Sequence, residues 1–178
     1  MKGRLLAILG SPHNNGATWK MLDYAMRIAK RHGYVVDYIH LYEKNIAFCK
    51  GCRACIELQD CVIKDDIQEI SRLLRECNII IVAAPVYWAN VPAIVKNMFD
   101  RLLGVMMEKT GAFPKPRLSN EQKYILFTAC NTPASTIFQS RCFKNFPHAP
   151  YCSCALPKKY RKRSWCITCS KKNIFLFI

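Results

Sequence analysis

The chain has 178 residues, of which 51% are hydrophobic and 22% charged, so its composition excludes a disordered or fibrous chain and predicts one globular domain with a core. Its net charge of +15 is unevenly spread, because residues 141–178 hold nine basic and no acidic side chains. Up to residue 140, 18 basic side chains stand against 12 acidic ones. Much of the excess positive charge therefore belongs to the C-terminal segment.

Neither export nor membrane insertion is expected. The apolar run at residues 5–9 is shorter than the apolar core of a secretory signal, and it ends in a glycine-containing turn. Residues 77–95 carry no charge, but Pro85 and Pro92 interrupt them, so we do not expect a membrane-spanning helix there. Eleven cysteines without an export signal indicate thiols, metal or iron-sulfur ligation in a reducing compartment, and we expect a cytoplasmic protein.

Strand-like and helix-like patterns alternate along the first 130 residues. In chain order we expect a strand at 5–9, a helix at 18–30, a strand at 34–39, a cysteine-rich loop at 45–64, a helix at 65–76, a strand at 79–84, a helix at 91–103 with Asn90 as its N-cap, and a strand at 123–129. This alternation is typical of a doubly wound parallel sheet in a three-layer α/β/α fold. Ligands bind such sheets beyond the carboxyl ends of the strands. The loops after the first, third and fourth strands are therefore the candidate ligand loops.

The first of these loops, GSPHNNGAT at residues 10–18, joins a strand to a helix. Its backbone N–H groups at the helix N-terminus suit an anion, and the hydroxyls of Ser11 and Thr18 can add hydrogen bonds. The loop lacks the lysine of a nucleotide-triphosphate loop and the spacing of a dinucleotide fingerprint, so a monophosphate fits best. An ordinary glycine- and asparagine-rich turn with a helix cap stays open as the alternative.

The loop after the third strand is aromatic. Pro85, Val86, Tyr87 and Trp88 leave that strand at its carboxyl end, where two aromatic side chains can flank a flat heteroaromatic ring. The alternative is that Tyr87 and Trp88 pack beneath a loop or at a dimer contact. The position at the strand end favours the ligand-binding interpretation.

Four segments together resemble a known family: GSPHNNGAT, GCRACIELQDCVIKDD, AAPVYWANVPAIVKNMFDR and TACNTP. They are similar to the flavodoxin-like NADPH-dependent FMN reductases, and the similarity covers residue 2 to about residue 133. The resemblance implies a flavodoxin-like doubly wound sheet that binds FMN. Each segment is a weak indication alone, and the combination is specific.

The resemblance also implies which residues bind the cofactor. The FMN phosphate would be held by the first loop, the isoalloxazine ring would be lined by the third, and the fourth would close its other side. These residues are Ser11, His13, Asn15, Gly16, Ala17 and Thr18 for the phosphate; Pro85, Val86, Tyr87, Trp88 and Asn90 for the ring; and Cys130, Asn131 and Thr132 for the closing side. His13 and Ala17 stand where relatives often carry Arg and Asn, which weakens the expected phosphate affinity without changing the ligand class.

The chemistry implied by the resemblance is hydride transfer from NADH or NADPH to the flavin, with electrons passed on to a quinone, another flavin or an acceptor protein. The cofactor supplies the reactivity, so no catalytic acid or base is nominated among the side chains. The resemblance further implies a homodimer in which partner residues cover the flavin, and the apolar face of the helix expected at 91–103 is consistent with that. Neither a membrane nor a nucleic acid is expected as a partner.

Four cysteines share the loop after the second strand. The spacing of Cys49, Cys52, Cys55 and Cys61 suits a 4Fe-4S cluster, because short loops let thiolates converge on one site. The motif closely resembles that of the iron-sulfur flavoproteins, which combine it with the same fold and carry electrons between ferredoxin-like donors and acceptors. Structural thiols, a reversible disulfide and a zinc site remain alternatives. Cys77 has no spacing partner and is expected to be a buried apolar residue.

The C-terminal segment departs from the family. We expect a flavodoxin-like domain at 1–135 and an atypical basic, cysteine-rich tail at 136–178, which lacks the family's closing helix, strand and helix. The fourth strand would then lie at an exposed sheet edge, with residues 173–178 as the best candidate for a fifth strand. Four tail cysteines leave a zinc-stapled nucleic-acid-binding protein as a rival function, which their irregular spacing disfavours. They are Cys152, Cys154, Cys166 and Cys169.

Overall fold

The computed structural model describes residues 3–88, 90–108, 115–119 and 121–129, and the backbone alone of residues 165–170. A five-stranded sheet runs through the molecule in the order β2-β1-β3-β6-β7. Its strands are β1 (Arg4–Leu9), β2 (Val35–His40), β3 (Ile79–Pro85), β6 (Lys123–Ala129) and β7 (Trp165–Ser170). The first four are parallel, and β7 pairs antiparallel with β6. The predicted doubly wound parallel sheet is confirmed, with an antiparallel strand added at one edge.

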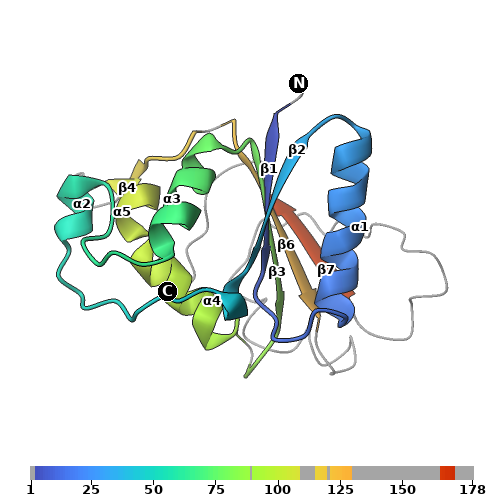
Figure 1. Cartoon of the computed structure of the whole chain (residues 1–178), viewed down its shortest axis with the longest axis horizontal. Helices are drawn as coiled ribbons and strands as arrows, with labels where there is room; N and C mark the ends of the chain where they lie inside the picture. The colour runs from blue at the N-terminus through green and yellow to red at the C-terminus, as the bar shows by residue number, and fades with distance from the viewer. Residues whose placement is uncertain (1–2, 89, 109–114, 120, 130–164, 171–178) are drawn as a thin grey trace.

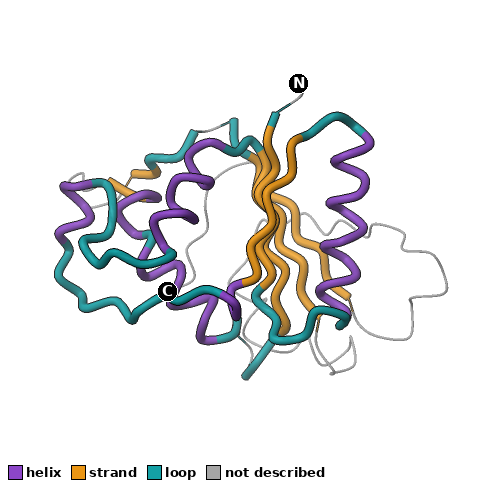
Figure 2. The backbone as a smooth tube through the Cα atoms, in the orientation of Figure 1, coloured by secondary structure: helices purple, strands orange, loops and turns teal. Residues whose placement is uncertain are grey.

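Helices cover both faces of this sheet (Figure 1). The helix α1 (Ala17–Arg31) lies on one face, and α3 (Ile67–Glu76), α4 (Ala93–Arg101) and α5 (Leu103–Met106) lie on the other. The smaller elements are η1 (Leu41–Glu43), α2 (Ala54–Leu58) and a short antiparallel pair, β4 (Met107–Glu108) with β5 (Lys115–Pro116). Figure 2 shows the strands edge-on between the helical layers, which is the expected α/β/α arrangement.

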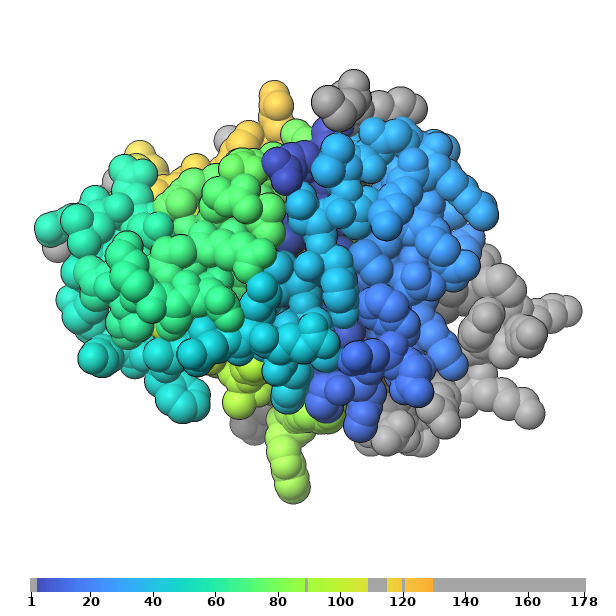
Figure 3. Space-filling model, in the orientation of Figure 1, coloured from blue at the N-terminus to red at the C-terminus, as the bar shows by residue number. Residues whose placement is uncertain are grey.

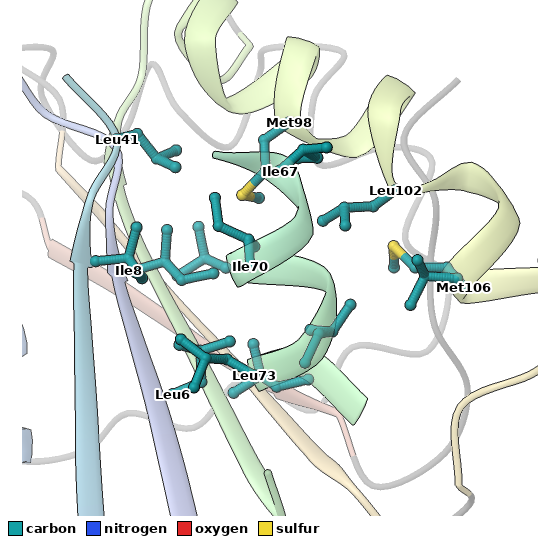
Figure 4. Packing of buried hydrophobic residues seen from close by; sticks show 14 of the residues in the cluster. Leu6, Ile8, Leu41, Ile67, Ile70, Leu73, Met98, Leu102 and Met106 are labelled. Carbon is teal, nitrogen blue, oxygen red and sulfur yellow. The ribbon is translucent and has the colours of Figure 1, made fainter. Parts of the chain in front are cut away.

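Two apolar clusters hold these layers together, one on each face of the sheet. Leu6 and Ile8 of β1 meet Ile70 of α3 and Met98 of α4 on one face (Figure 4). On the other face, the alternate β1 residues pack against Leu22 and its neighbours on α1. Because both faces of β1 are buried, the strand is a continuous apolar run, and that run predicted the strand at 5–9.

The helix expected at 91–103 begins later than predicted. The residue before a proline is pushed away from helical conformation, so Val91 stays outside the helix and Pro92 occupies the N-cap position. Asn90 is therefore not the N-cap, and that assignment was wrong. The helix is also interrupted at Leu102, so two shorter helices, α4 and α5, replace the single helix predicted.

The edge of the sheet beyond β6 also differs from expectation. Residues Tyr124 to Ala129 are paired in register with Ser170 to Trp165, so the tail supplies an antiparallel fifth strand. The fourth strand is thus covered along this length, and the predicted exposed edge was wrong. Residues 173–178, which we expected to form the fifth strand, lie outside the described residues. Within the described part of the chain, no helix is long and apolar enough to cross a bilayer.

Candidate functional site

The carboxyl ends of β1, β3 and β6 lie side by side because these strands are neighbours in the sheet. Leu9 is paired with Ala83, and Pro85 with Ala129, so the segments that follow emerge along one edge. In Figure 1 this edge lies at the bottom of the sheet, where the β1–α1 loop turns. Two of the three predicted ligand loops are thereby brought together. Cys130, Asn131 and Thr132, in the loop after the fourth predicted strand, lie outside the described residues.

The first loop is fitted closely against the helix that follows β3. The Gly10 amide donates to the Ala83 carbonyl at 2.8 Å, which continues the sheet by one bond. A Cβ atom on Gly10 would lie 2.2 Å from Val95 Cγ2 and 3.3 Å from the Ala84 Cβ. Glycine at this position therefore lets the loop start directly over α4.

Two hydroxyl side chains of this loop are buried and suited to bind an anion. Ser11 is 4% exposed and Thr18 3% exposed. The Ser11 hydroxyl accepts a hydrogen bond from the His13 amide at 3.2 Å, which leaves its proton available for a ligand. Among the described residues, the Thr18 hydroxyl has no hydrogen-bond partner. A buried hydroxyl without a partner is costly, so a ligand oxygen at this position would satisfy it.

The start of α1 offers backbone donors next to these hydroxyls. Gly16 is the N-cap and its helix has no side-chain cap and no acidic residue in the first turn. The first amides of the helix are consequently available to an anion, and no carboxylate competes with it. Gly16 and Ala17 are half-buried, whereas His13 and Asn15 are exposed. The predicted phosphate residues thus surround one helix N-terminus.

The loop after β3 is a tight aromatic turn. The amide of Tyr87 donates to the Asn90 carbonyl at 2.8 Å and the Asn90 amide donates back to Tyr87 at 2.9 Å. Trp88, inside this turn, has a φ of 50°, in the left-handed region that a bulky side chain rarely adopts. Its side chain is fully exposed, and the light-green segment containing it projects from the lower surface in Figure 3. An unsupported Trp on a strained turn is a candidate ligand contact.

Two residues at the same edge, His40 and Tyr42, were not predicted from the sequence, because only the cysteines were considered in the segment after β2. Tyr42 follows β2 and is exposed. Partial burial raises the pKa of Tyr42, and Tyr87 raises it further. His40, at the end of β2, is buried and bonded to the Ser11 carbonyl. The order β2-β1-β3 places both residues beside the predicted site. Because β2 ends at the same edge as β1, the residues at its carboxyl end could have been included among the candidates.

The four cysteines of the second-strand loop line one pocket on the helical side away from α1. Cys49 and Cys52 are exposed, Cys55 is half-buried and Cys61 is buried. Burial raises the pKa of Cys55, and the charges of the other three thiols add to that rise. Among the described residues, however, no group of three His, Cys, Asp or Glu side chains is arranged as a preformed metal site. The loop brings the thiols to one pocket without converging them.

A buried arginine fixes both ends of this loop. Arg101 is 1% exposed, and its Nε donates to Cys61 Sγ at 3.1 Å. Its guanidinium also forms a two-pronged contact with Asp65, at 2.7 and 3.0 Å. Two further bonds reach the Ala47 carbonyl at 2.6 Å and the Ile63 carbonyl at 3.0 Å. One side chain of α4 thus binds both ends of the cysteine loop.

The buried aspartate partner stays ionised. Burial by itself would raise the pKa of Asp65, but hydrogen bonds from Arg101 and from the Ala47 and Ile67 amides hold that pKa below its ordinary value. The Asp65 amide and side chain also anchor Gln68 and Ile67 at the start of α3, which begins at Ile67 rather than at the predicted residue 65.

The middle of the loop depends on a glycine. A Cβ on Gly104 of α5 would lie 1.9 Å from the Cys55 carbonyl oxygen. The backbones of α2 and α5 therefore approach each other so closely that only glycine fits at this position. By contrast, Cys77 is remote from the motif, 3% exposed, and burial raises its pKa to about 12, which confirms the prediction of a buried apolar residue.

The layers, the strand order and the site at the carboxyl edge define a flavodoxin-like α/β protein. The same architecture occurs in the NAD(P)H:quinone oxidoreductase of Methanothermobacter marburgensis, which is 12% identical and superposes with a TM-score of 0.66 over 82% of this chain and 76% of that one. The pattern of the NADPH-dependent FMN reductase family matches residues 3–119. The chain belongs to this family.

Two curated relatives show which branch of the family is similar. An iron-sulfur flavoprotein of Archaeoglobus fulgidus is 40% identical over 100 residues, covering 56% of this chain and 46% of the relative. An iron-sulfur flavoprotein of Methanosarcina thermophila is 40% identical over 98 residues, covering 55% and 51% respectively. The chain thus spans about half the length of the curated relatives it matches. The predicted resemblance is confirmed by these relatives and by the family pattern.

Proposed function

We propose that this chain binds FMN and works as an FMN-dependent NAD(P)H oxidoreductase, which takes hydride from NADH or NADPH and passes electrons to a quinone, another flavin or a protein acceptor. The observation that carries the proposal is the pair of buried hydroxyls, Ser11 and Thr18, at an uncapped helix N-terminus. The loop before that helix and the aromatic turn leave neighbouring strands at the same edge. One FMN could therefore place its phosphate at the helix and its ring at the turn. Membership of the FMN reductase family supports the same ligand.

In this proposal the bound flavin supplies the redox chemistry, and the chain binds and orients it. Ser11 and Thr18 donate to the phosphate together with the first amides of α1. Pro85 and Val86 shape the backbone beside the ring, with the Val86 amide held by the Ala129 carbonyl at 2.9 Å. Tyr87 and Trp88 supply exposed aromatic surface to the ring and shield it from water. No side chain is assigned as nucleophile, acid or base.

Substitution of the buried hydroxyl tests the phosphate assignment. Thr18→Val keeps the shape of the side chain and removes the donor, so FMN should bind at least about tenfold more weakly. The matched control is Thr110→Val, a change of the same type at a threonine that is not assigned to the site. Flavin fluorescence titration measures both variants. Equal FMN affinity in Thr18→Val and the unsubstituted protein would remove Thr18 from the site.

A second function is favoured by the cysteine pocket and by the names of the 40% identical relatives. In it, Cys49, Cys52, Cys55 and Cys61 hold a 4Fe-4S cluster, and the protein carries electrons between ferredoxin-like partners. The guanidinium of Arg101 beside Cys61 fits a thiolate ligand, since a cation offsets the negative charge of such a site. The exposed Cys49 and Cys52 would move inward to reach the same cluster as Cys61.

Anaerobic reconstitution with iron and sulfide distinguishes the two functions. A cluster would give broad absorbance near about 400 nm that disappears when the four cysteines become serine. Iron-free protein after reconstitution would reject the cluster and leave the thiols structural. Rapid bleaching of bound flavin by NADPH favours the reductase, whereas reduction only through a ferredoxin-like donor favours the electron carrier.

The homodimer also remains a proposal, but on different grounds from those of the sequence. Much of the apolar face of α4 and α5 packs into the chain's own core, through Val95, Met98, Val105 and Met106, so less of it is available for an interface than the sequence suggested. The exposed side chains of Tyr42, Tyr87 and Trp88 at the site edge support a partner there instead. Light scattering of FMN-loaded protein at micromolar concentration should give twice the chain mass, and a fully loaded monomer would contradict it. A cytoplasmic location is proposed from the cysteine content alone.

A further inference from the structure

His40 lies directly behind the phosphate loop. It is the last residue of β2 and is paired in register with Leu9, the last residue of β1, so its side chain stands next to the start of the loop. The side chain is 4% exposed. Its Nε2 lies 2.8 Å from the Ser11 carbonyl oxygen, and its Nδ1 lies 2.8 Å from Glu43 Oε1. The ring therefore bridges the loop to η1.

These two contacts suit a ring that carries a proton on both nitrogens. A carbonyl oxygen can only accept, so Nε2 must carry a proton. An N–H on Nδ1 would likewise donate to the carboxylate of Glu43, whose side chain is 65% exposed. A ring that donates from both nitrogens is an imidazolium, and it carries a full positive charge.

The remaining neighbours leave that charge in place. Tyr42 also faces His40, with ring centroids 6.1 Å apart. Burial, and next the charge of Tyr87, raises the pKa of Tyr42, so its phenol is neutral near pH 7. The facing anion is then Glu43 of η1, and the β1–α1 loop presents only the Ser11 carbonyl to the ring.

The phosphate loop itself lacks a permanent charge. Residues 10–18 contain no lysine or arginine, and the one ionisable side chain among them, His13, is exposed. An FMN phosphate is close to dianionic at neutral pH, so a fixed positive charge nearby would strengthen its binding. Resting on the proposed FMN function, we propose that His40 is a positioning residue for the phosphate loop: its imidazolium holds the Ser11 carbonyl and supplies the positive charge that the loop sequence lacks.

The charge and its effect on the ligand can be measured separately. Nitrogen-15 NMR of the histidine rings reports how many ring nitrogens are protonated, without any flavin. At pH 7 His40 should show two protonated nitrogens, and Glu43→Gln should reduce this to one, because the amide oxygen and nitrogen can satisfy a neutral ring. A singly protonated His40 ring in the unsubstituted protein would overturn the proposal.

The ligand test compares FMN with riboflavin, which has the same ring without the phosphate. His40→Gln should raise the dissociation constant of FMN at least about fivefold and leave that of riboflavin unchanged. His32→Gln, at the exposed C-cap of α1, is the matched control and should change neither. Equal weakening of both flavins in a folded His40→Gln variant would mean a purely structural role and would overturn the proposal.

The affinities of the unsubstituted protein for FMN and riboflavin can also be measured over a series of pH values. This test does not depend on whether His40→Gln folds. Above pH 7, where the phosphate no longer titrates, FMN should lose affinity relative to riboflavin in step with the loss of the second ring proton of His40. A constant ratio of the two affinities through that loss would overturn the proposal. If the unsubstituted protein bound neither flavin, the FMN function would fail, while the NMR measurement would still decide the charge of His40.

Discussion

Arg101 and Asp65, 36 residues apart in the chain, form a buried ion pair in which the guanidinium is 0% and the carboxylate 8% exposed. The same guanidinium binds Cys61 and two carbonyls of the cysteine loop. A buried charge whose partner is removed is left uncompensated, so the pair determines both the stability of the fold and the shape of the loop.

The first prediction concerns the loss of either partner. Arg101→Met and Asp65→Asn should each lower the free energy of unfolding by about 3–5 kcal/mol, measured by urea denaturation. Arg27→Met breaks the exposed i,i+4 pair with Asp23 and serves as control, with an expected cost under about 1 kcal/mol. Similar small losses in all three variants would show that the buried pair is not a structural centre.

The second prediction concerns acid. Hydrogen bonds from Arg101 hold the native pKa of Asp65 below its unfolded value, despite the opposing effect of burial. This pair therefore stabilises the fold above the unfolded pKa of about 3.9, and the contribution is lost as the pH falls through the lower native pKa. The stability difference between the unsubstituted protein and Asp65→Asn should narrow below about pH 4. A difference that stayed constant from pH 7 to pH 3 would contradict this.

The third prediction concerns the close approach at Gly10. Gly10→Ala would place a Cβ 2.2 Å from Val95 Cγ2, and the stiff valine cannot rotate away, so the variant should lose about 1–3 kcal/mol of stability. Val95→Ala creates room for that methyl group. The double variant should be more stable than the sum of the two single changes predicts. Simple additivity in thermal unfolding would mean that the loop does not press on α4.

The fourth prediction separates the thiols by reactivity. Cys49 and Cys52 are exposed, whereas burial raises the pKa of Cys77 to about 12, so little thiolate forms there at pH 8. Among the five cysteines whose side chains are described, alkylation followed by peptide mass mapping should label Cys49 and Cys52 first and Cys77 last. Unfolded protein, in which all thiols are accessible, supplies the reference rates. Early labelling of Cys77 in folded protein would contradict its position in the core.

The sequence predicted the elements whose residues are set by local pattern. The strand at Lys123–Ala129 was predicted with its observed bounds, and the expectation that the loops after β1 and β3 leave the sheet at one edge followed from the rules of parallel sheets. The helix after the aromatic turn was placed too early, because its apolar spacing outweighed the effect of Pro92 on the preceding residue. The fold was therefore predictable wherever burial on both sides of a strand leaves a continuous apolar run.

The missed features depend on contacts between distant residues. Nothing in the spacing of Arg101 indicates that it would bind Cys61, 40 residues away. His40 lies just beyond the strand predicted at 34–39, and its importance comes from the Ser11 carbonyl in the loop after the neighbouring strand β1. The antiparallel strand at Trp165–Ser170 was missed because the basic, cysteine-rich segment around it lacks an apolar run.

The most direct test of the account is a titration of the folded protein with FMN, followed by flavin fluorescence and by the flavin released on denaturation. The two loops at the carboxyl edge predict saturable binding of close to one FMN per chain, with the flavin emission quenched by the aromatic turn at Tyr87 and Trp88. A folded sample that binds no FMN at saturating concentration would contradict the central claim.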